Sequence, residues 1–469
     1  MVAFRLAVFL LLGIVASQAP AASRPNIMFI LVDDLAWADL GCYGHQWHHT
    51  PHIDQLAREG VQFMSAYAPA PICSASRASI LTGKTVARVG LEFVVKNEPG
   101  QQVIDPPQPL RAPPITSGLP LKETTIAEHL QKAGYATAFF GKWHLNSHHQ
   151  RYLGWSPTHG PKQHGFETAE EDFGSHPYNR KKLKPLTKED EFLPDGITER
   201  AIQYLGRQHE RPFFLMVSHF YVHTPIRSPY VWLKKKYEKL AREPRRTQRI
   251  EYAAFVETLD HHVGELLSAL KSNGLERNTL VVFMSDNGGH PEYTANNLRG
   301  SKWNLYEGGI RIPMIARWPG HSQPGGKRYH PVIGYDLFAT FAAAAQRPTE
   351  ETDGMDLLPI INRGGRDFPR PLFWHFTYYH PEGQKFNHAK PDIGINDFIT
   401  SQTRPHSAIR YGRYKLIYFD EDQRAELYKV RGGNETLELS NQAKEMKQHL
   451  LTTLMKHLDS AKARRAQRP

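Results

Sequence analysis

Four short apolar segments constrain the fold of this 469-residue chain more than any other feature. Each has the length of a buried strand and is rich in β-branched or aromatic residues. The segments are residues 26–32 (NIMFILV), 136–140 (ATAFF), 212–218 (PFFLMVS) and 279–285 (TLVVFMS). We expect all of them to be strands of one sheet.

Segments with helical character alternate with these strands. Residues 124–134 begin at a threonine cap and end at Gly134, and residues 251–274 carry apolar side chains at helical spacing before an Asn-Gly stop. This alternation predicts an α/β fold with a large, helix-flanked, mostly parallel mixed sheet.

The pattern changes after about residue 345. Residues 407–419 and 425–430 alternate like strands of a hairpin, and residues 441–463 have the spacing of an amphipathic helix. They predict a smaller C-terminal α+β domain with an antiparallel sheet, a terminal helix and a basic tail.

The first residues have the form of a secretory signal. Arg5 precedes an apolar run from Leu6 to Ala16, and an Ala-x-Ala arrangement follows it. The run is short for a membrane span, so we predict a periplasmic or secreted protein without stable membrane insertion after signal removal; an uncleaved anchor is the alternative. The predicted divisions are a signal peptide at 1–22, an N-terminal domain at 23–345 and a C-terminal domain at 346–469.

The net charge of +11 favours an anionic partner or substrate, because long-range attraction concentrates such molecules near the surface. Part of the excess lies in residues 232–249 and 460–469, which could simply be solvated faces. We predict no nucleic-acid partner.

The chain has two cysteines, Cys42 and Cys73. An exported protein could join them in one disulfide, although a chain of this length does not need one. Cys73 lies in the segment PICSASRASILTG, beside Arg77. It could be half of a disulfide, a buried thiol, or a residue that is chemically modified.

Polar side chains follow the first and the fourth strand. Asp33 and Asp34 come directly after residue 32, and Asp286 and Asn287 begin the sequence DNGG after residue 285. The two aspartates alone could cap a helix, and DNGG alone could form a hairpin turn. Together, at the carboxyl edge of one sheet, they supply the hard oxygen ligands that Ca²⁺ or Mg²⁺ requires.

Cationic and proton-transferring side chains follow the other strands. Lys142 and His144 lie in GKWH and would point the same way if the strand continued through them. His223 in HTP and Lys302 in RGSKWN could join them. Such groups beside a divalent cation suit a substrate with several charged oxygens, such as a sulfate or phosphate ester.

Several of these segments, taken together, resemble those of a known family. The segment CSASRASILTG resembles the signature of the type I, formylglycine-dependent sulfatases of the alkaline-phosphatase-like superfamily. The resemblance continues in order from ILVDDLAWADLGCYG through GYATAFFGKWHL and FMSDNGG to the distal ELYKV. Ala75 replaces a more frequent proline, which the family tolerates, and Ala38 replaces a commoner glycine.

The resemblance implies a cofactor pair. Cys73 would be converted to formylglycine by a formylglycine-generating enzyme during maturation. One calcium ion would be held by residue 73 together with the side chains of Asp33, Asp34, Asp286 and Asn287.

The resemblance also implies roles for the cationic residues. Arg77 and Lys142 would hold the hydrated aldehyde, and His144 would accept the proton that triggers sulfate release. His223 and Lys302 would contact the sulfate, and either could protonate the leaving alcohol, with a slight preference for His223.

The substrate is less defined than the reaction. Export and positive charge favour a sulfated carbohydrate. Residues 373–388 combine aromatic rings and histidines, with His375 as a candidate rim contact, although they could instead be a packed strand. Two alternatives remain, a phosphoric or phosphonic monoester hydrolase on the same scaffold and a non-catalytic polyanion-binding protein.

Overall fold

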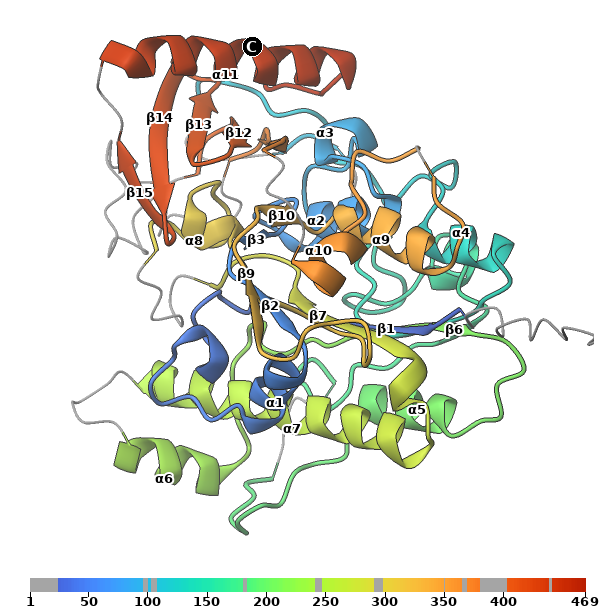
Figure 1. Ribbon diagram of the computed structural model, residues 1–469. Helices are drawn as coiled ribbons and strands as arrows, with labels where there is room; N and C mark the ends of the chain where they lie inside the picture. Colours follow the sequence, from blue (N-terminus) through green and yellow to red (C-terminus); the bar gives the residue numbers. More distant parts are fainter. Residues whose placement is uncertain are drawn as a thin grey trace, which may run out of the picture.

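A large mixed sheet forms the centre of the protein in a computed structural model (Figure 1). The predicted signal segment lies outside the described part of the chain. The structure describes residues 24–95, 100–102, 108–179, 184–240, 247–290, 298–349, 351–364, 369–379, 403–437 and 441–469.

The four predicted strands are confirmed, and they are neighbours. β4 (Ala136–Gly141), β6 (Phe213–Ser218), β1 (Asn26–Val32) and β7 (Thr279–Ser285) lie side by side in this order, and every pairing between them is parallel. Their carboxyl ends therefore meet at one edge of the sheet.

Further strands extend the sheet to eight in the order β5-β4-β6-β1-β7-β8-β2-β9. β5 is parallel to β4 and β9 is parallel to β2, whereas β8 is antiparallel to both β7 and β2. The predicted mostly parallel mixed sheet is therefore confirmed. The added strands are β5 (Thr168–Glu170), β8 (Met314–Arg317), β2 (Val61–Phe63) and β9 (Gly326–Arg328).

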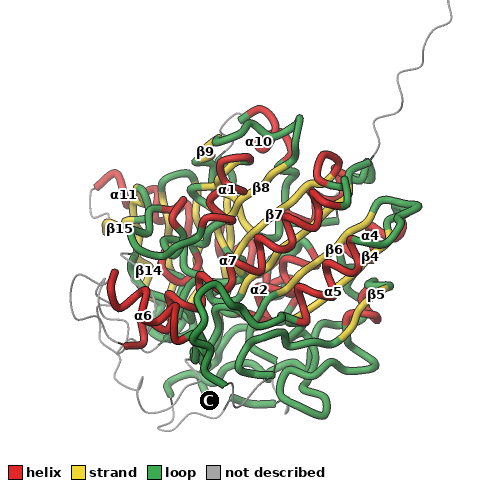
Figure 2. Tube along the Cα trace, turned by 90° about the horizontal axis from the view of Figure 1, so that it is seen from below, coloured by secondary structure: helices red, strands yellow, loops and turns green. Residues whose placement is uncertain are grey.

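Helices cover both faces of the sheet, as Figures 1 and 2 show. Alternate residues of β1 enter two cores, with Phe29 on the face under α2 and α9 and Ile30 on the face under α1 and α7. The covering helices are α2 (Cys73–Thr82), α4 (Ile126–Lys132) and α9 (Asp336–Ala344) on one side, and α1 (Pro51–Glu59), α5 (Gly196–Leu205) and α7 (Thr247–Ser272) on the other.

The predicted threonine cap is confirmed at α4. The Thr125 hydroxyl accepts a hydrogen bond from the Glu128 backbone, and the Glu128 side chain accepts one from the Thr125 backbone. This reciprocal capping box fixes where the helix begins.

The smaller elements are α3 (Val86–Val89), α6 (Val231–Leu240), α8 (Glu307–Ile310), α10 (Leu358–Arg363), the 3-10 helices Gly41–Tyr43, Pro161–His164 and Glu276–Asn278, and the strands β3 (Ala66–Tyr67) and β10 (Val332–Ile333).

The C-terminal region forms a separate antiparallel sheet, as predicted. Leu450, Leu454 and Leu458 of the terminal helix α11 pack against Ile409 and Leu416 of this sheet. The elements are β11 (Pro371–Phe376), β12 (His406–Tyr411), β13 (Tyr414–Phe419), β14 (Arg424–Arg431), β15 (Asn434–Leu437) and α11 (Asn441–Ser460).

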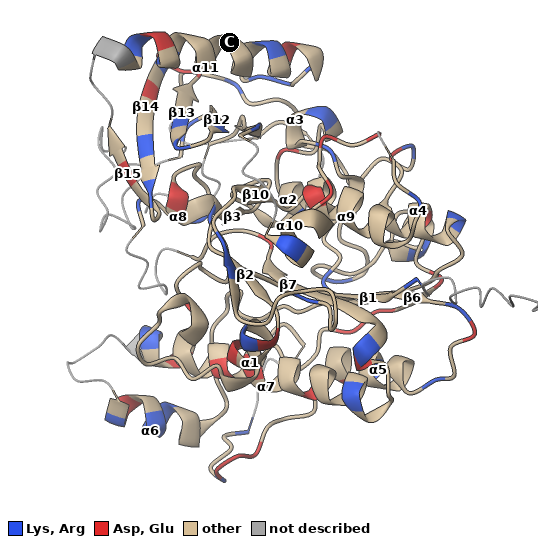
Figure 3. Ribbon diagram, in the orientation of Figure 1, with Lys and Arg blue, Asp and Glu red and all other residues tan. Residues whose placement is uncertain are grey.

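In the described part of the basic segment 232–249, helix α6 carries exposed lysines on its outer face and pairs two others with a neighbouring helix. Figure 3 shows lysines and acidic residues interspersed on α6 and α11. Lys234 and Lys236 form ion pairs with Glu251 and Glu257 of α7. No helix among the described residues has both the length and the apolar character needed to span a bilayer.

Candidate active site

The carboxylates that follow β1 and β7 meet because these two strands are parallel neighbours. The last paired residues of the strands, Val32 and Ser285, precede them directly. Asn287 Nδ2 donates to Asp34 Oδ1 at 2.6 Å, and the Asp34 backbone N–H donates to Asp286 Oδ1 at 3.3 Å. Asp33, Asp34, Asp286 and Asn287 are all buried, so the oxygens form one polar cluster inside the protein.

Neither simpler interpretation of these residues holds. The next α-helix after Asp34, α1, begins only at Pro51, and the strand that follows DNGG, β8, begins only at Met314. The aspartates therefore do not cap α1, and DNGG does not connect a tight hairpin.

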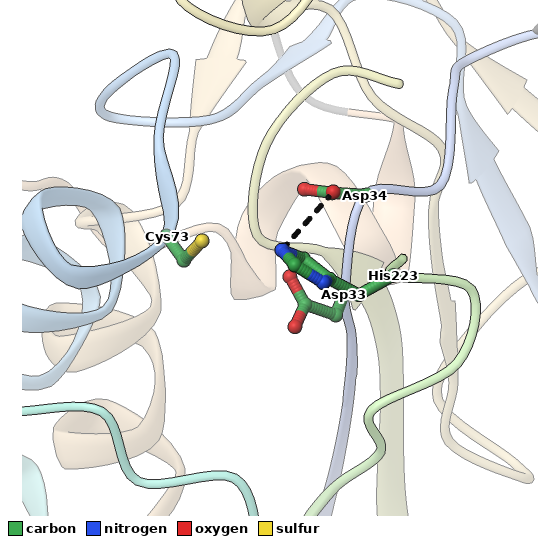
Figure 4. Close-up of side chains that lie close together, drawn as sticks. All are labelled: Asp33, Asp34, Cys73 and His223. Carbon is green, nitrogen blue, oxygen red and sulfur yellow. Dashed lines mark ion pairs between the residues drawn. The ribbon is translucent and has the colours of Figure 1, made fainter. Parts of the chain in front are cut away.

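Cys73 is the first residue of α2 and faces the carboxylates (Figure 4). Its sulfur and ligand atoms of Asp33, Asp34 and His223 all lie within 4.8 Å of one another. Both cysteines are free thiols, so no disulfide joins Cys73 to Cys42. Cys42 is partly exposed.

Burial shapes the chemistry of the Cys73 thiol. Removal from water raises its pKa to about 11, despite the opposing effect of Lys142 and Lys302. The thiol is therefore neutral at physiological pH and a poor nucleophile in its unmodified form.

Three cations complete the cluster. Arg77 donates from Nε to Asp286 Oδ2 at 2.8 Å, Lys302 Nζ lies 2.7 Å from Asp34 Oδ2, and Lys142 is paired with Asp33. Three buried carboxylates thus face three buried cations. A bound divalent cation would give the site a net positive charge suited to a sulfate or phosphate ester.

The carboxylates differ in their proton affinity. Burial alone would raise the pKa of Asp33, but Lys142, His223 and Arg77 together hold it below its usual range. Burial, with Asp33 nearby, raises the pKa of Asp286 to about 7 although Arg77 opposes the shift. Lys302 and His223 likewise hold the pKa of Asp34 below its usual value against burial, so Asp33 and Asp34 are the more readily ionised carboxylates of the cluster.

His144 lies three residues beyond the end of β4, in a segment that is neither helix nor strand. β4 ends at Gly141, whose φ of 110° and close approach to the Ser218 carbonyl leave no room for a side chain. The strand therefore does not continue through Lys142 and His144, and alternation along a strand does not orient them. His144 Nε2 lies 3.2 Å from the Val95 carbonyl oxygen, and its buried Nδ1 has no hydrogen-bond partner.

The protonation of His144 is set by its surroundings. Burial, and then the charges of Lys142 and Arg77, hold its pKa well below its usual value. A neutral imidazole can accept a proton.

His223 follows β6 and is oriented by hydrogen bonds at Nδ1. This nitrogen lies 2.6 Å from the Thr224 carbonyl oxygen and 3.0 Å from the Tyr178 hydroxyl. Since a carbonyl can only accept, Nδ1 carries a hydrogen, and Nε2 faces Asp34 Oδ2 at 3.6 Å. Burial and Lys302 lower the pKa of His223 to about 4.

Sequence reasoning missed several contacts of the site. Ser218, the last residue of β6, accepts from Arg77 Nη1 at 2.6 Å, and its position at a strand end was a usable signal. His176 Nε2 lies 2.8 Å from the His223 carbonyl oxygen. Neither His176 nor Tyr178 follows a predicted strand, so no pattern in the sequence pointed to them.

His375 is not brought to this cluster. It lies in β11, is buried, and has Nδ1 2.8 Å from Ser407 Oγ and Nε2 2.9 Å from the Arg464 carbonyl oxygen. Both ring nitrogens are engaged, so the packed-strand interpretation describes His375 and no ring nitrogen is left for a substrate. Residues 380–388 of the predicted aromatic segment lie outside the described residues.

The oxygen atoms of the cluster fit a hard divalent cation. Asp33 Oδ1 and Asn287 Oδ1 are buried and have no hydrogen-bond partner, which is costly unless a cation binds them. Carboxylate and amide oxygens are the donors that such cations prefer. The cluster can therefore hold a metal ion directly beside Cys73.

Comparison with known proteins gives one consistent result. The Sulfatase family profile matches residues 25–346, and a profile for the C-terminal part of N-sulphoglucosamine sulphohydrolase matches residues 301–464. The chain is 33% identical over 401 residues to N-acetylgalactosamine-6-sulfatase of Mus musculus, covering 78% of this chain and 71% of that protein. It is 33% identical over 445 residues to arylsulfatase A of Homo sapiens, covering 88% of this chain and 78% of that protein.

Solved structures agree. The structure of Ps i-CgsB in complex with k-i-k-neocarrahexaose superimposes with a TM-score of 0.71 at 27% identity, covering 93% of each chain. The similarity therefore extends over both sheets.

Proposed function

The chain belongs to the sulfatase family, and from this premise we propose that it removes sulfate from a sulfated carbohydrate, using a formylglycine made from Cys73 and one calcium ion. The enzyme is a sulfuric ester hydrolase. The observation that carries the mechanism is the buried group of three carboxylates, one amide oxygen and three cations around residue 73.

In this proposal the oxygens of Asp33, Asp34, Asp286 and Asn287 hold calcium together with residue 73. The ion supplies a Lewis acid that neutralises charge on sulfate oxygens. Asp33 Oδ1 and Asn287 Oδ1, the two buried oxygens without partners, support this ligand set.

Residue 73 is the proposed nucleophile after conversion by a formylglycine-generating enzyme. A hydrated aldehyde supplies two hydroxyls on one carbon, one to attack sulfur and one to allow release of sulfate. The raised pKa of the unmodified thiol supports the need for this modification.

The remaining residues bind charge and move protons. Arg77 and Lys142 stabilise negative charge on the side chain of residue 73, and neutral His144 accepts the proton that accompanies sulfate release. Lys302 and His223 bind the sulfate. We favour His223 as the acid that protonates the leaving alcohol, acting as the imidazolium, because its Nδ1–H is fixed by Thr224 and its Nε2, which would carry the transferred proton, faces the cluster. The negative charge of a bound sulfate would favour this charged form against the lowering effect of burial and Lys302 on the pKa of His223.

The substrate class rests on relatives and charge. One relative is an N-acetylgalactosamine-6-sulfatase, and one related structure holds neocarrahexaose, both pointing to sulfated sugars. We propose a periplasmic or secreted location, a catalytic domain over residues 23–345 and a smaller domain over 346–469.

A direct test uses protein made with and without the formylglycine-generating enzyme. Only the first sample should release sulfate from a panel of sulfated mono- and oligosaccharides, and its peptide containing residue 73 should show an aldehyde in the mass spectrum. Full activity with an intact thiol would refute the nucleophile. Faster hydrolysis of nitrophenyl phosphate than nitrophenyl sulfate, or heparin binding without desulfation, would refute the proposed reaction.

A further inference from the structure

An exposed tyrosine stands on a well-defined loop at the edge of the site. Tyr152 is 54% exposed, one of few large apolar side chains among the described residues to be so open. The loop that carries it follows His144. Leu153 anchors the loop in the core, and Asn146 Nδ2 donates to the Gly154 carbonyl at 3.0 Å. Packing and hydrogen bonding on both sides thus hold the backbone that presents Tyr152.

The Tyr152 ring lies in the middle of an arc of rings. It contacts His148 edge-on with ring centres 4.7 Å apart and Tyr178 with ring centres 5.3 Å apart. His148 lies 6.0 Å from the ring of His144, and Tyr178 lies 5.9 Å from the ring of His223. The arc therefore runs from His144, the expected proton acceptor, to His223, the expected acid. Tyr152 is separated from each of these histidines by one intervening ring.

The inner rings of the arc have partners within the protein. The Tyr178 hydroxyl accepts from His223 Nδ1 and also interacts with the Tyr152 hydroxyl, and Tyr178 is partly buried. Tyr152 differs because 54% of the residue is exposed beside the site. A rigid aromatic ring fixed at its edge and open on a face is suited to binding a flat apolar surface.

We propose that Tyr152 is a stacking platform for the sugar ring adjacent to the sulfated unit, an inference that rests on the proposed function. The C–H face of a pyranose is apolar, and its hydroxyls point outward around the ring. Covering that face with Tyr152 removes apolar surface from water on both partners. Because one ring separates Tyr152 from each histidine, the sulfated unit occupies the space beside the histidines and its neighbour lies on Tyr152.

The test compares two substrates on the formylglycine-bearing enzyme. One is the best sulfated monosaccharide of a panel that includes N-acetylgalactosamine 6-sulfate, and the other is a tetrasaccharide ending in the same sulfated unit. Tyr152→Ala should raise the KM for the tetrasaccharide about tenfold and change kcat/KM for the monosaccharide by less than about twofold. Tyr152→Trp should retain the wild-type KM.

Tyr329→Ala is the matched control, because Tyr329 is 68% exposed but lies far from the site. It directly follows β9, at one edge of the sheet, whereas the Tyr152 loop follows β4, beside the other edge. It should leave both substrates unaffected. Equal loss on both substrates in Tyr152→Ala would overturn the inference, since Tyr152 would then act through Tyr178 and His223. No change on either substrate would also overturn it.

A binding measurement separates this inference from the proposed reaction. If the wild-type enzyme released no sulfate from any substrate, the proposed function would fail. Calorimetry of the tetrasaccharide with the Cys73→Ala protein would still test the platform. Tyr152→Ala in that background should weaken binding about tenfold, and an unchanged Kd would overturn the inference alone.

Discussion

Lys302 and Asp34 lie 268 positions apart in the sequence, yet Lys302 Nζ is 2.7 Å from Asp34 Oδ2. A calcium ion held by Asp34 would therefore share this carboxylate with Lys302. Two cations on the same group repel each other, and this repulsion is strong in a buried site. The pair allows substrate binding and metal binding to be separated by mutation.

Lys302→Met should bind calcium at least as tightly as the wild type and lose at least about a hundredfold in kcat/KM, because a sulfate contact is lost while a competing cation is removed. Asp34→Asn should instead lose calcium affinity. Calcium titration by calorimetry and sulfate release measure the two effects. Parallel loss of calcium in both variants would contradict the assigned role of Lys302.

Arg77 is expected to be a structural as well as a catalytic residue. Its guanidinium binds Asp286, the Lys142 carbonyl and Ser218 while almost fully buried. Arg77→Met removes the cation paired with buried Asp286, while Ser218 Oγ keeps its hydrogen bond to the Lys142 carbonyl, and should lower the free energy of unfolding by about 3–5 kcal/mol. Denaturant unfolding measures the loss, and Arg77→Lys should show a smaller one. A loss below about 1 kcal/mol in Arg77→Met would show that the partners reorganise.

The sequence alone predicted the parts of the site that depend on local pattern. Asp33 and Asp286 follow continuous apolar strands, and parallel strands must bring their carboxyl ends together. The contact of Arg77 in α2 with Ser218 in β6 depends on how the helix packs on the sheet, which no local pattern records; the strand-end position of Ser218 marked only one of the two partners.

Two predictions from the sequence, the strand through GKWH and the sugar contact at His375, were wrong for local reasons. Continuing β4 through GKWH ignored Gly141, the last residue of β4, which has a positive φ and packs too closely against the Ser218 carbonyl for a side chain. Aromatic composition around His375 suggested a sugar contact, but pairing of β11 with β12 and the C-terminal tail bury the ring. Composition could not distinguish the buried rings from Tyr152.

Asp39 should make stability depend on pH. Burial raises its pKa from near 3.8 to about 7, although Tyr252 and the Ala36 backbone N–H donate to Oδ2. Between these values the folded protein keeps a proton that the unfolded chain releases. Asp39 therefore costs stability as pH rises through this window, by up to about 1.4 kcal/mol per pH unit, and the cost is complete above the folded pKa.

Asp39→Asn removes this titration and keeps an oxygen for the same two donors. Its stability relative to the wild type should therefore increase from pH 5 to pH 7.5. Thermal unfolding of both proteins in matched buffers measures the difference, which cancels the titration of unrelated groups. A relative stability that stays unchanged over this range would show that Asp39 is already ionised in the folded protein at pH 5.

The basic tail should contribute to stability through one arginine. Arg464 donates from Nε to Glu92 Oε1 at 3.1 Å and from Nη2 to the Gly90 carbonyl at 2.7 Å, and Glu92 is buried. Arg464→Met leaves the Glu92 carboxylate without this partner. Because the Arg464 side chain is 32% exposed, water can replace part of the contact, and we expect a loss of about 1–3 kcal/mol.

Arg465→Met is the matched control for this change. Arg465 lies next in the chain and pairs with Asp459, whose side chain is 74% exposed, so its loss should cost less than about 0.5 kcal/mol. Glu92→Gln should reduce the effect of Arg464→Met, because a neutral side chain no longer needs the cation. Equal stability of Arg464→Met and Arg465→Met in denaturant unfolding would show that Glu92 finds another partner.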